Sequence, residues 1–181
     1  MRLLKQIFIG IVGMGLVLLL ISLLLSSHVR VSKSVLISAP KDNIIQHLLQ
    51  LREWKFWNPL LQDSSLNYSF PAGNEAQWKT ADGKTNSIRL EHYATDSVNA
   101  IIATNDQKAF ASGFTIKYNT DGTKLTKVEW WISEDISWYP WEKFYGLFSE
   151  SLKETYLENS LQAFKRYIEN DTAQPAVQSN P

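Results

Sequence analysis

The hydrophobic positions near the start of the chain form one unbroken run. Residues Ile7–Leu25 carry no charged side chain and one hydroxyl, that of Ser22. At 1.5 Å per residue, an α-helix over this run spans about 28 Å, which matches the hydrocarbon core of a bilayer. A helix that is apolar on every side has no polar face to offer to water. The run therefore predicts a transmembrane helix, and the membrane is the first expected partner.

A cleaved signal peptide is the competing interpretation of the same run. The apolar stretch of a signal peptide is usually about 7–15 residues long and ends at a small-x-small cleavage site. Here the run is longer and ends Leu-Leu-Leu-Ser-Ser at residues 23–27, which favours an uncleaved anchor. Basic residues flank both ends, so the orientation rests on the short basic N-terminal tail, which usually stays cytoplasmic. We expect a single-pass membrane protein whose globular domain is extracytoplasmic.

After the apolar run, the pattern changes to short segments of alternating polarity. Val29–Ser38 is rich in β-branched residues and predicts a strand, while Pro40 suits the first turn of a helix. A second short helix is expected over Arg52–Leu61. Six strand-like runs follow, separated by turn signals such as Asp82-Gly83 and Asp121-Gly122, and they predict an antiparallel meander. These runs are Leu66–Phe70, Glu75–Thr80, Asn86–Ala94, Val98–Thr104, Ala109–Asn119 and Thr123–Glu134.

The last periodic segment has the spacing of a helix. Apolar residues recur every three or four positions from Phe144 to Ile168, which predicts a long amphipathic helix ending near Asn170. This helix is long enough to cover the apolar face of a curved sheet, and the first strand would pair with the last. The expected organisation is a membrane anchor over 1–27, an α+β domain over 28–170 and a polar, disordered tail over 171–181.

Composition then narrows the classes of function. Basic and acidic residues are equal in number, 18 each, and alternate along the chain, whereas a nucleic-acid-binding domain usually carries a basic face. The absence of cysteine excludes disulfides and thiolate metal sites. His28, His47 and His92 do not have metal-ligand spacing, and the sequence contains no nucleophile elbow or nucleotide-binding loop. We expect no nucleic acid, no metal, no cofactor and no identifiable catalytic residue.

Several local motifs resemble those of the START/Bet v 1-like (SRPBCC) superfamily, and within it the membrane-tethered members of the polyketide cyclase/dehydrase-like group. The resemblance covers about Val29 to Asn170. It implies a helix-grip fold, in which a curved antiparallel sheet wraps a long C-terminal helix. It also implies a cavity between sheet and helix, but the superfamily includes lipid carriers, receptors and a few cyclases, so it does not choose one function. The motifs are Ser38-Ala39-Pro40, Trp54-x-x-Trp57-Asn58-Pro59, Val128-Glu129-Trp130 and Tyr139-Pro140-Trp141-Glu142-Lys143-Phe144.

The seven tryptophans fall largely into two clusters, which predicts an aromatic wall for that cavity. Packing of an ordinary core is the alternative interpretation, because each buried aromatic removes about 150–250 Å² from water. Trp130 and Trp131 are adjacent in a strand, so only one can face the helix, and the register of the strand favours Trp130. The candidate cavity residues are Trp54, Trp57, Leu90, His92, Phe114, Ile116, Trp130, Tyr139 and Trp141.

The loop before the final helix carries aromatic residues with no obvious packing role. Trp138, Tyr139 and Trp141 either cap the mouth of the cavity or contact the bilayer at the level of the headgroups. Both possibilities remain open at the level of sequence.

The leading hypothesis is a non-enzymatic, membrane-anchored helix-grip domain that binds an apolar small molecule or lipid. One alternative is an enzyme of the cyclase or hydratase type, with His92 or Glu91 as the base, since a histidine titrates near neutral pH. Another is a partner-binding module whose cavity is vestigial. The sequence predicts neither the ligand nor the oligomeric state.

Overall fold

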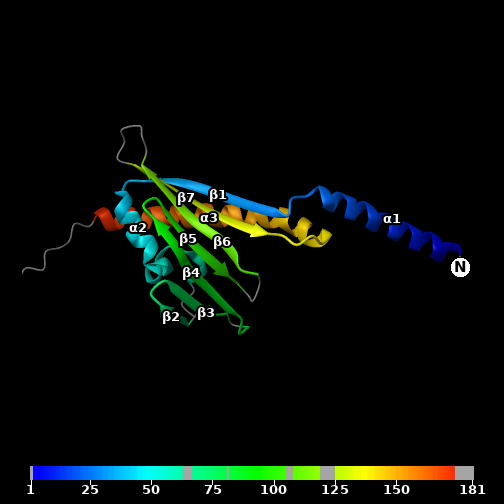
Figure 1. Cartoon of the computed structure of the whole chain (residues 1–181), viewed down its shortest axis with the longest axis horizontal. Coiled ribbons are helices and arrows are strands. Elements are labelled where there is room, and N and C mark those ends of the chain that lie inside the picture. Colours follow the sequence, from blue (N-terminus) through cyan, green and yellow to red (C-terminus); the bar gives the residue numbers. More distant parts are fainter. Residues whose placement is uncertain (1, 63–66, 81, 105–107, 119–124, 174–181) are drawn as a thin grey trace, which may run out of the picture.

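The computed structural model describes residues 2–62, 67–80, 82–104, 108–118 and 125–173, without the side chains of residues 2, 92, 147 and 173. Within these residues, a twisted sheet lies on a long helix, and another helix leaves the domain at one end (Figure 1). The elements are α1 (Arg2–Leu24), β1 (His28–Ile37), α2 (Lys41–Leu49), the 3-10 helices η1 (Leu51–Phe56) and η2 (Pro59–Leu61), β2 (Tyr68–Ala72), β3 (Glu75–Lys79), β4 (Thr85–Ala94), β5 (Ser97–Ala103), β6 (Phe110–Tyr118), β7 (Thr126–Asp135) and α3 (Pro140–Ala173).

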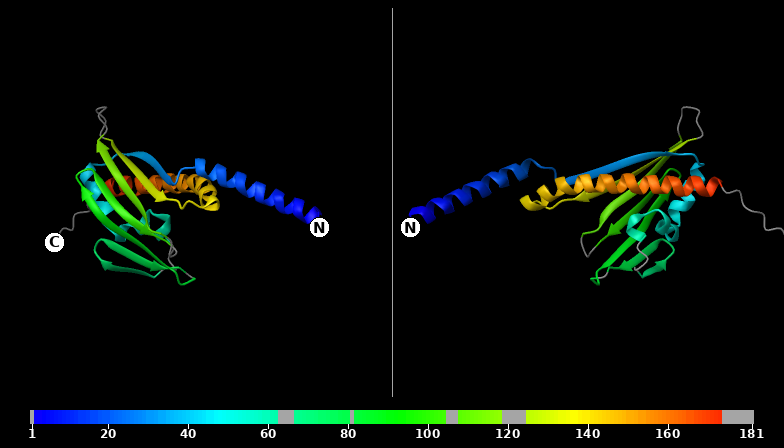
Figure 2. Two further views of the ribbon diagram at one scale, coloured as in Figure 1. Left: turned by 45° about the vertical axis from the view of Figure 1, so that its right-hand side comes forward. Right: turned by 180° about the vertical axis from the view of Figure 1, so that it is seen from behind.

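The sheet has seven antiparallel strands in the order β1-β7-β6-β5-β4-β3-β2. Strands β2 to β7 follow one another as a meander, and β1 pairs with β7 from His28↔Asp135 to Ile37↔Thr126. The sheet is covered by α3, which runs across one of its faces (Figure 2). The α+β class, the meander and the pairing of the first strand with the last are therefore confirmed.

The turn between β3 and β4 shows why its sequence predicted a hairpin. Gly83 has a φ of 83°, a left-handed conformation that glycine adopts without the steric cost of a Cβ atom. A hydrogen bond closes this turn, since the Thr80 amide donates to the Lys84 carbonyl at 2.9 Å. The other predicted turn, Asp121-Gly122, lies outside the described residues.

The centre of the gap between sheet and helix is filled by aromatic side chains. The ring of Trp57 lies 4.7 Å from that of Phe164 on α3 and 5.9 Å from that of Trp130 on β7, measured between centroids. Trp54 and Phe114 complete the group, and all five side chains are at most 1% exposed. Trp54 Nε1 donates to the Leu48 carbonyl at 2.9 Å. This packing removes large apolar areas from water and stabilises the domain.

Adjacent residues of β7 lie on opposite faces of the sheet, as the register predicted. Trp130 is buried in the core, whereas Trp131 lies on the outer face with the Arg30 guanidinium 4.5 Å from its ring centroid. Gly113 of β6 makes room for the outer ring, because a Cβ there would lie 2.7 Å from the Trp131 side chain. The glycine thus permits an aromatic ring to lie flat across the neighbouring strand.

The apolar N-terminal run is a helix that projects away from the domain (Figure 2). Its segment Leu3–Leu24 is long and apolar enough to cross a membrane, with a mean hydropathy of 2.9 and little of it buried. At the other end of the chain, α3 continues to Ala173, three residues beyond the predicted end at Asn170. The remaining residues of the predicted tail lie outside the described residues.

Candidate functional site

The structure divides the nine predicted cavity residues into separate groups. Trp54, Trp57, Phe114, Ile116 and Trp130 are buried in the closed centre of the sheet–helix gap. They pack against one another and against α3, so their role as ligand contacts stays a prediction.

The other predicted residues lie elsewhere. Leu90 lines a separate hollow of about 250 Å³ together with Glu91 and Tyr93. Tyr139 immediately precedes α3 and Trp141 lies in its first turn. This end of α3 lies near the end of α1 (Figure 1). The side chain of His92 lies outside the described part of the structure, although its backbone belongs to β4 and pairs with Asn99.

An open pocket lies beside the first half of α3, about 290 Å³ in volume. Its walls come from the ends of strands β5, β6 and β7, from η2 and from one side of α3. The apolar wall consists of Leu60, Phe110, Ile132, Tyr145, Leu152 and Tyr156. Such a mixture of aliphatic and aromatic side chains suits an apolar ligand.

Polar groups are concentrated at the rim of this pocket. Lys153 of α3 forms an ion pair with Glu134 of β7, and both residues line the pocket together with Thr104 and Ser149. The Ser149 hydroxyl donates to the Gly146 carbonyl at 2.9 Å. A second pocket of about 360 Å³ shares Glu134, Tyr145 and Ser149 with the first, so the two form neighbouring hollows along the same turns of α3.

Tyr156 connects the pocket to the buried core. Its hydroxyl donates to Asn58 Oδ1 at 2.8 Å, and the same oxygen accepts the Leu60 amide at 3.0 Å. Burial raises the pKa of Tyr156 well above its usual value, against smaller lowering effects of hydrogen bonds with Ser160 and Asn58. Tyr156 is thus a neutral hydrogen-bond donor throughout the physiological pH range.

The side-chain amide of Asn58 also has a donor group without a hydrogen bond among the described residues. It is fully buried, and its Nδ2 has no hydrogen-bond partner among the described residues, nor does the neighbouring Trp57 Nε1. Buried donors are usually satisfied, since an unmade bond costs about 1–3 kcal/mol. Both donors lie in the closed core and not among the residues that line the pocket.

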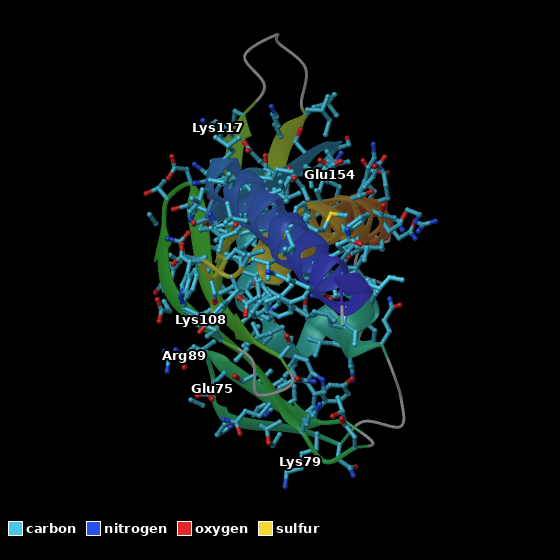
Figure 3. The ribbon with its side chains drawn as sticks, turned by 90° about the vertical axis from the view of Figure 1, so that its right-hand side faces the viewer. Glu75, Lys79, Arg89, Lys108, Lys117 and Glu154 are labelled. Carbon is cyan, nitrogen blue, oxygen red and sulfur yellow. The ribbon has the colours of Figure 1, made fainter. Side chains whose placement is uncertain are left out.

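Charges elsewhere on the domain are dispersed. Figure 3 looks onto the end from which α1 leaves and shows Arg89 and Lys108 on one side and Glu154 on the other. Glu154 accepts a hydrogen bond from Lys33 Nζ at 3.0 Å, and Arg89 pairs with Glu91 at 3.1 Å. Within the described part of the chain, the charges are paired or scattered over several elements.

The sequence predicted that the amphipathic final helix covers the sheet, and several large apolar side chains in its first half are nevertheless exposed. Phe148 and Leu152 are 74% and 70% exposed, and Tyr145 is 70% exposed. The sequence signal for the difference is an additional stripe at positions 141, 145, 148 and 152, which lies roughly opposite the buried stripe on a helical wheel. Tyr145 and Leu152 of that stripe line the pocket beside α3.

The comparisons with known proteins bear on the fold. No family model and no curated protein matches the sequence. A START superfamily protein from Mycobacterium smegmatis superposes with a TM-score of 0.59 at 16% identity, covering 78% of this chain and 97% of that one. A protein of unknown function from Staphylococcus aureus gives 0.61 at 14% identity, covering 81% and 97%.

The third solved structure is a two-domain protein. The di-domain ARO/CYC StfQ from the steffimycin biosynthetic pathway gives a TM-score of 0.59 at 10% identity, covering 81% of this chain and 52% of that one. Together these likenesses show a helix-grip fold like that of START superfamily proteins. At sequence identities of 10% to 16%, these structural likenesses are evidence for the fold alone.

Proposed function

We propose that this helix-grip domain of the START/Bet v 1-like kind binds an apolar small molecule or lipid in the pocket beside the first half of α3, and that α1 holds it at a membrane. The observation that carries the proposal is the position of the open space. The centre of the sheet–helix gap is closed by aromatic packing, while the pocket of about 290 Å³ lies at the end near α1. This volume is close to the lower end of the usual range for small-molecule sites, which suits a ligand with one hydrocarbon chain or one ring system.

The chemistry of the pocket supports a ligand with an apolar body and one polar end. Its wall is mostly aliphatic and aromatic, which favours burial of hydrocarbon by about 25 cal/mol per Å². The Lys153–Glu134 pair, which lines the pocket and is partly exposed, can interact with a polar group of the ligand. Neutral Tyr156 can donate to an acceptor oxygen, provided that it leaves Asn58.

The exposed apolar surface of α1 supports the membrane anchor. Leu16, Leu20 and Leu24, for example, are 57%, 54% and 87% exposed. Water would not stabilise such a surface, whereas a bilayer core would. The extracytoplasmic position of the domain stays a prediction.

The enzymatic alternative is less well supported by the geometry. Glu91, one of its two suggested bases, is exposed, pairs with Arg89 and lies at a different hollow from the pocket beside α3. The titratable groups of the pocket rim, Glu134 and Lys153, are paired with each other. Because these two charged groups hold each other, the pocket is better suited to binding a ligand than to transferring a proton.

Native mass spectrometry of the full chain released from detergent micelles tests the proposal, with palmitic acid as the added probe. We expect a 1:1 adduct with the wild-type chain. Thr104→Trp places an indole in the pocket and should reduce the adduct at least tenfold. Thr155→Trp is the matched control, because Thr155 is exposed on α3 and outside the pocket wall.

Two outcomes would contradict the proposal. One is a wild-type chain that forms no adduct with the probe and carries no co-purified apolar molecule. The other is an adduct that survives Thr104→Trp but is lost in Thr155→Trp, which would place the site on another face of α3. Thermal unfolding of both variants shows that they are folded.

A further inference from the structure

The start of α3 and the loop before it expose a continuous aromatic surface. We name this surface the aromatic face. Its residues are 38% to 74% exposed and are Trp138, Tyr139, Trp141, Tyr145, Phe148 and Leu152. Trp141, Tyr145, Phe148 and Leu152 are spaced by four, three and four residues and therefore share one side of the helix. The rings of Tyr139 and Trp141 stack at 5.0 Å, and Trp138 lies 4.6 Å from Tyr139. So large an apolar group on the surface is typical of an interaction site.

The aromatic face lies beside the end of the proposed membrane anchor. Lys143 is buried in this region, and its Nζ donates to the Leu25 carbonyl at 2.9 Å, which satisfies a free carbonyl at the C-terminus of α1. Ser22, in the last turn of α1, is only 1% exposed. The Ile136 amide, just before the aromatic face, donates to the Ser27 carbonyl at 2.8 Å. The two helices are thus joined at this point, as Figures 1 and 2 show.

This junction sets the level of the aromatic face relative to the apolar span. The span ends at Leu24, and Ile136 and Lys143 form hydrogen bonds just beyond it. The aromatic residues 138–141 lie between these two positions in the chain and therefore start close to the level where a bilayer would end. Trp and Tyr are enriched at that level because their rings combine an apolar body with a polar tip. Phe148 and Leu152 add purely apolar area to the same side of the helix.

The charges around the aromatic face point to a neutral partner. Among the first turns of α3, the two basic residues are already engaged: Lys143 is buried against Leu25, and Lys153 pairs with Glu134 of β7. A surface that binds through anionic lipids usually gathers several basic residues of one sign. The aromatic face therefore suits the apolar boundary of a zwitterionic bilayer, through a contact that salt does not screen.

We propose that the aromatic face rests in the interface of the same bilayer that α1 spans, a proposal that rests on the membrane anchoring proposed above. Tyr145 and Leu152 belong both to the aromatic face and to the pocket wall. With this face in the bilayer, the pocket opens at the boundary between headgroups and acyl chains. Its ligand class is then an amphiphile that enters from the membrane rather than from water.

Tryptophan quenching in phosphatidylcholine vesicles tests the inference with the full chain. The segment 1–27 contains no tryptophan, and Trp54, Trp57, Trp78 and Trp130 are buried in the domain. Trp131 is half-buried on the outer face of the sheet, beside the Arg30 guanidinium. Trp138 and Trp141 are 64% and 66% exposed, so lipid-borne quenchers act chiefly on them. We expect a spin label near the headgroup to quench the fluorescence more strongly than one at the end of the acyl chain. Trp138→Phe with Trp141→Phe should abolish this quenching.

A tryptophan at the far end of α3 serves as the control. Phe56 is 57% exposed and stacks on Tyr167 of α3. Tyr167 lies about 39 Å along the helix from Trp141. Phe56→Trp in the double variant should restore exposed fluorescence without restoring quenching. Equal quenching at positions 56 and 141 would mean nonspecific adsorption and would overturn the inference.

The remaining outcomes separate this inference from the anchoring on which it rests. If the chain floats with vesicles but shows no more quenching than the double variant, the anchor stands and the aromatic face does not dock. If the quenching disappears at high salt, the contact is electrostatic and the apolar argument is wrong. If the chain does not float with vesicles at all, the proposed anchoring fails, and the docking inference fails with it.

Discussion

The two halves of α3 have the same apolar repeat but opposite environments. In the second half, Leu157, Leu161, Phe164 and Ile168 are at most 1% exposed. In the first half, the side chain of Phe148 is 74% exposed. The second half lies across the sheet, whereas α3 begins beyond the ends of the strands, beside α1 (Figure 2). A helical apolar stripe therefore predicts that something covers it, but not that the covering element belongs to the same protein domain.

The difference also separates stability from function within one helix. The second half packs on the aromatic core, where each large side chain removes much apolar area from water. The first half carries the open pocket and the aromatic face, whose apolar area is left for a ligand or a bilayer. Substitutions in the two halves should consequently affect different measurements.

The largest effect is expected from a matched pair of phenylalanines. Phe164→Ala should lower the free energy of unfolding by about 3–5 kcal/mol, because it leaves a cavity among Trp57 and its neighbours. Phe148→Ala, the same change on the exposed half, should alter it by less than about 0.5 kcal/mol. Urea unfolding of the full chain in detergent, followed by circular dichroism, measures both. Similar losses in the two variants would show that the first half is also packed.

An intermediate effect is expected at the boundary between the halves. Asn58→Ala removes the acceptor of both the Tyr156 hydroxyl and the Leu60 amide and should cost about 1–3 kcal/mol of unfolding free energy. Tyr156→Phe removes one donor and should cost less, roughly 1 kcal/mol. In the double variant the two losses should not add, because the residues share one hydrogen bond. Additive losses would mean that this bond contributes little.

The smallest effect is expected at Tyr167, near the far end of α3. Burial, followed by the charge and hydrogen bond of Glu53, raises the pKa of Tyr167 to about 12. The unfolded chain releases the same proton near pH 10, so the folded state binds it more tightly between these values. The stabilisation is complete below about pH 10 and is lost as pH rises towards 12. Urea unfolding across this range should show a shallower decline for Tyr167→Phe, and an unchanged slope would refute this assignment.

Much of the fold could be predicted because its signals are local. Period-two segments separated by Asp-Gly and Pro-Ala-Gly turns predicted the meander, and alternation within Val128–Ile132 predicted that Trp130 faces the core. The cavity was harder to predict, because an aromatic cluster has the same sequence signature whether it lines a hollow or fills it. Trp54 and Trp57 fill it here, with ring centroids 5.0 Å apart.

The pocket beside α3 could not be predicted residue by residue. Its wall combines Leu60, Phe110, Ile132 and Leu152 from four separate elements, and no short-range pattern connects them. The helical spacing of Phe148 and Leu152 was part of the predicted apolar face, and periodicity alone does not distinguish a buried face from an exposed one.

The sequence by itself determined the apolar helix, the order of strands and helices and the α+β class, since hydrophobic periodicity and turn chemistry act between near neighbours. Tertiary structure decided which apolar surfaces are covered. It closed the centre of the sheet–helix gap with tryptophans and left the start of α3 uncovered beside α1. Coverage depends on which side of the helix faces the sheet, and this is set by contacts between residues far apart in the chain.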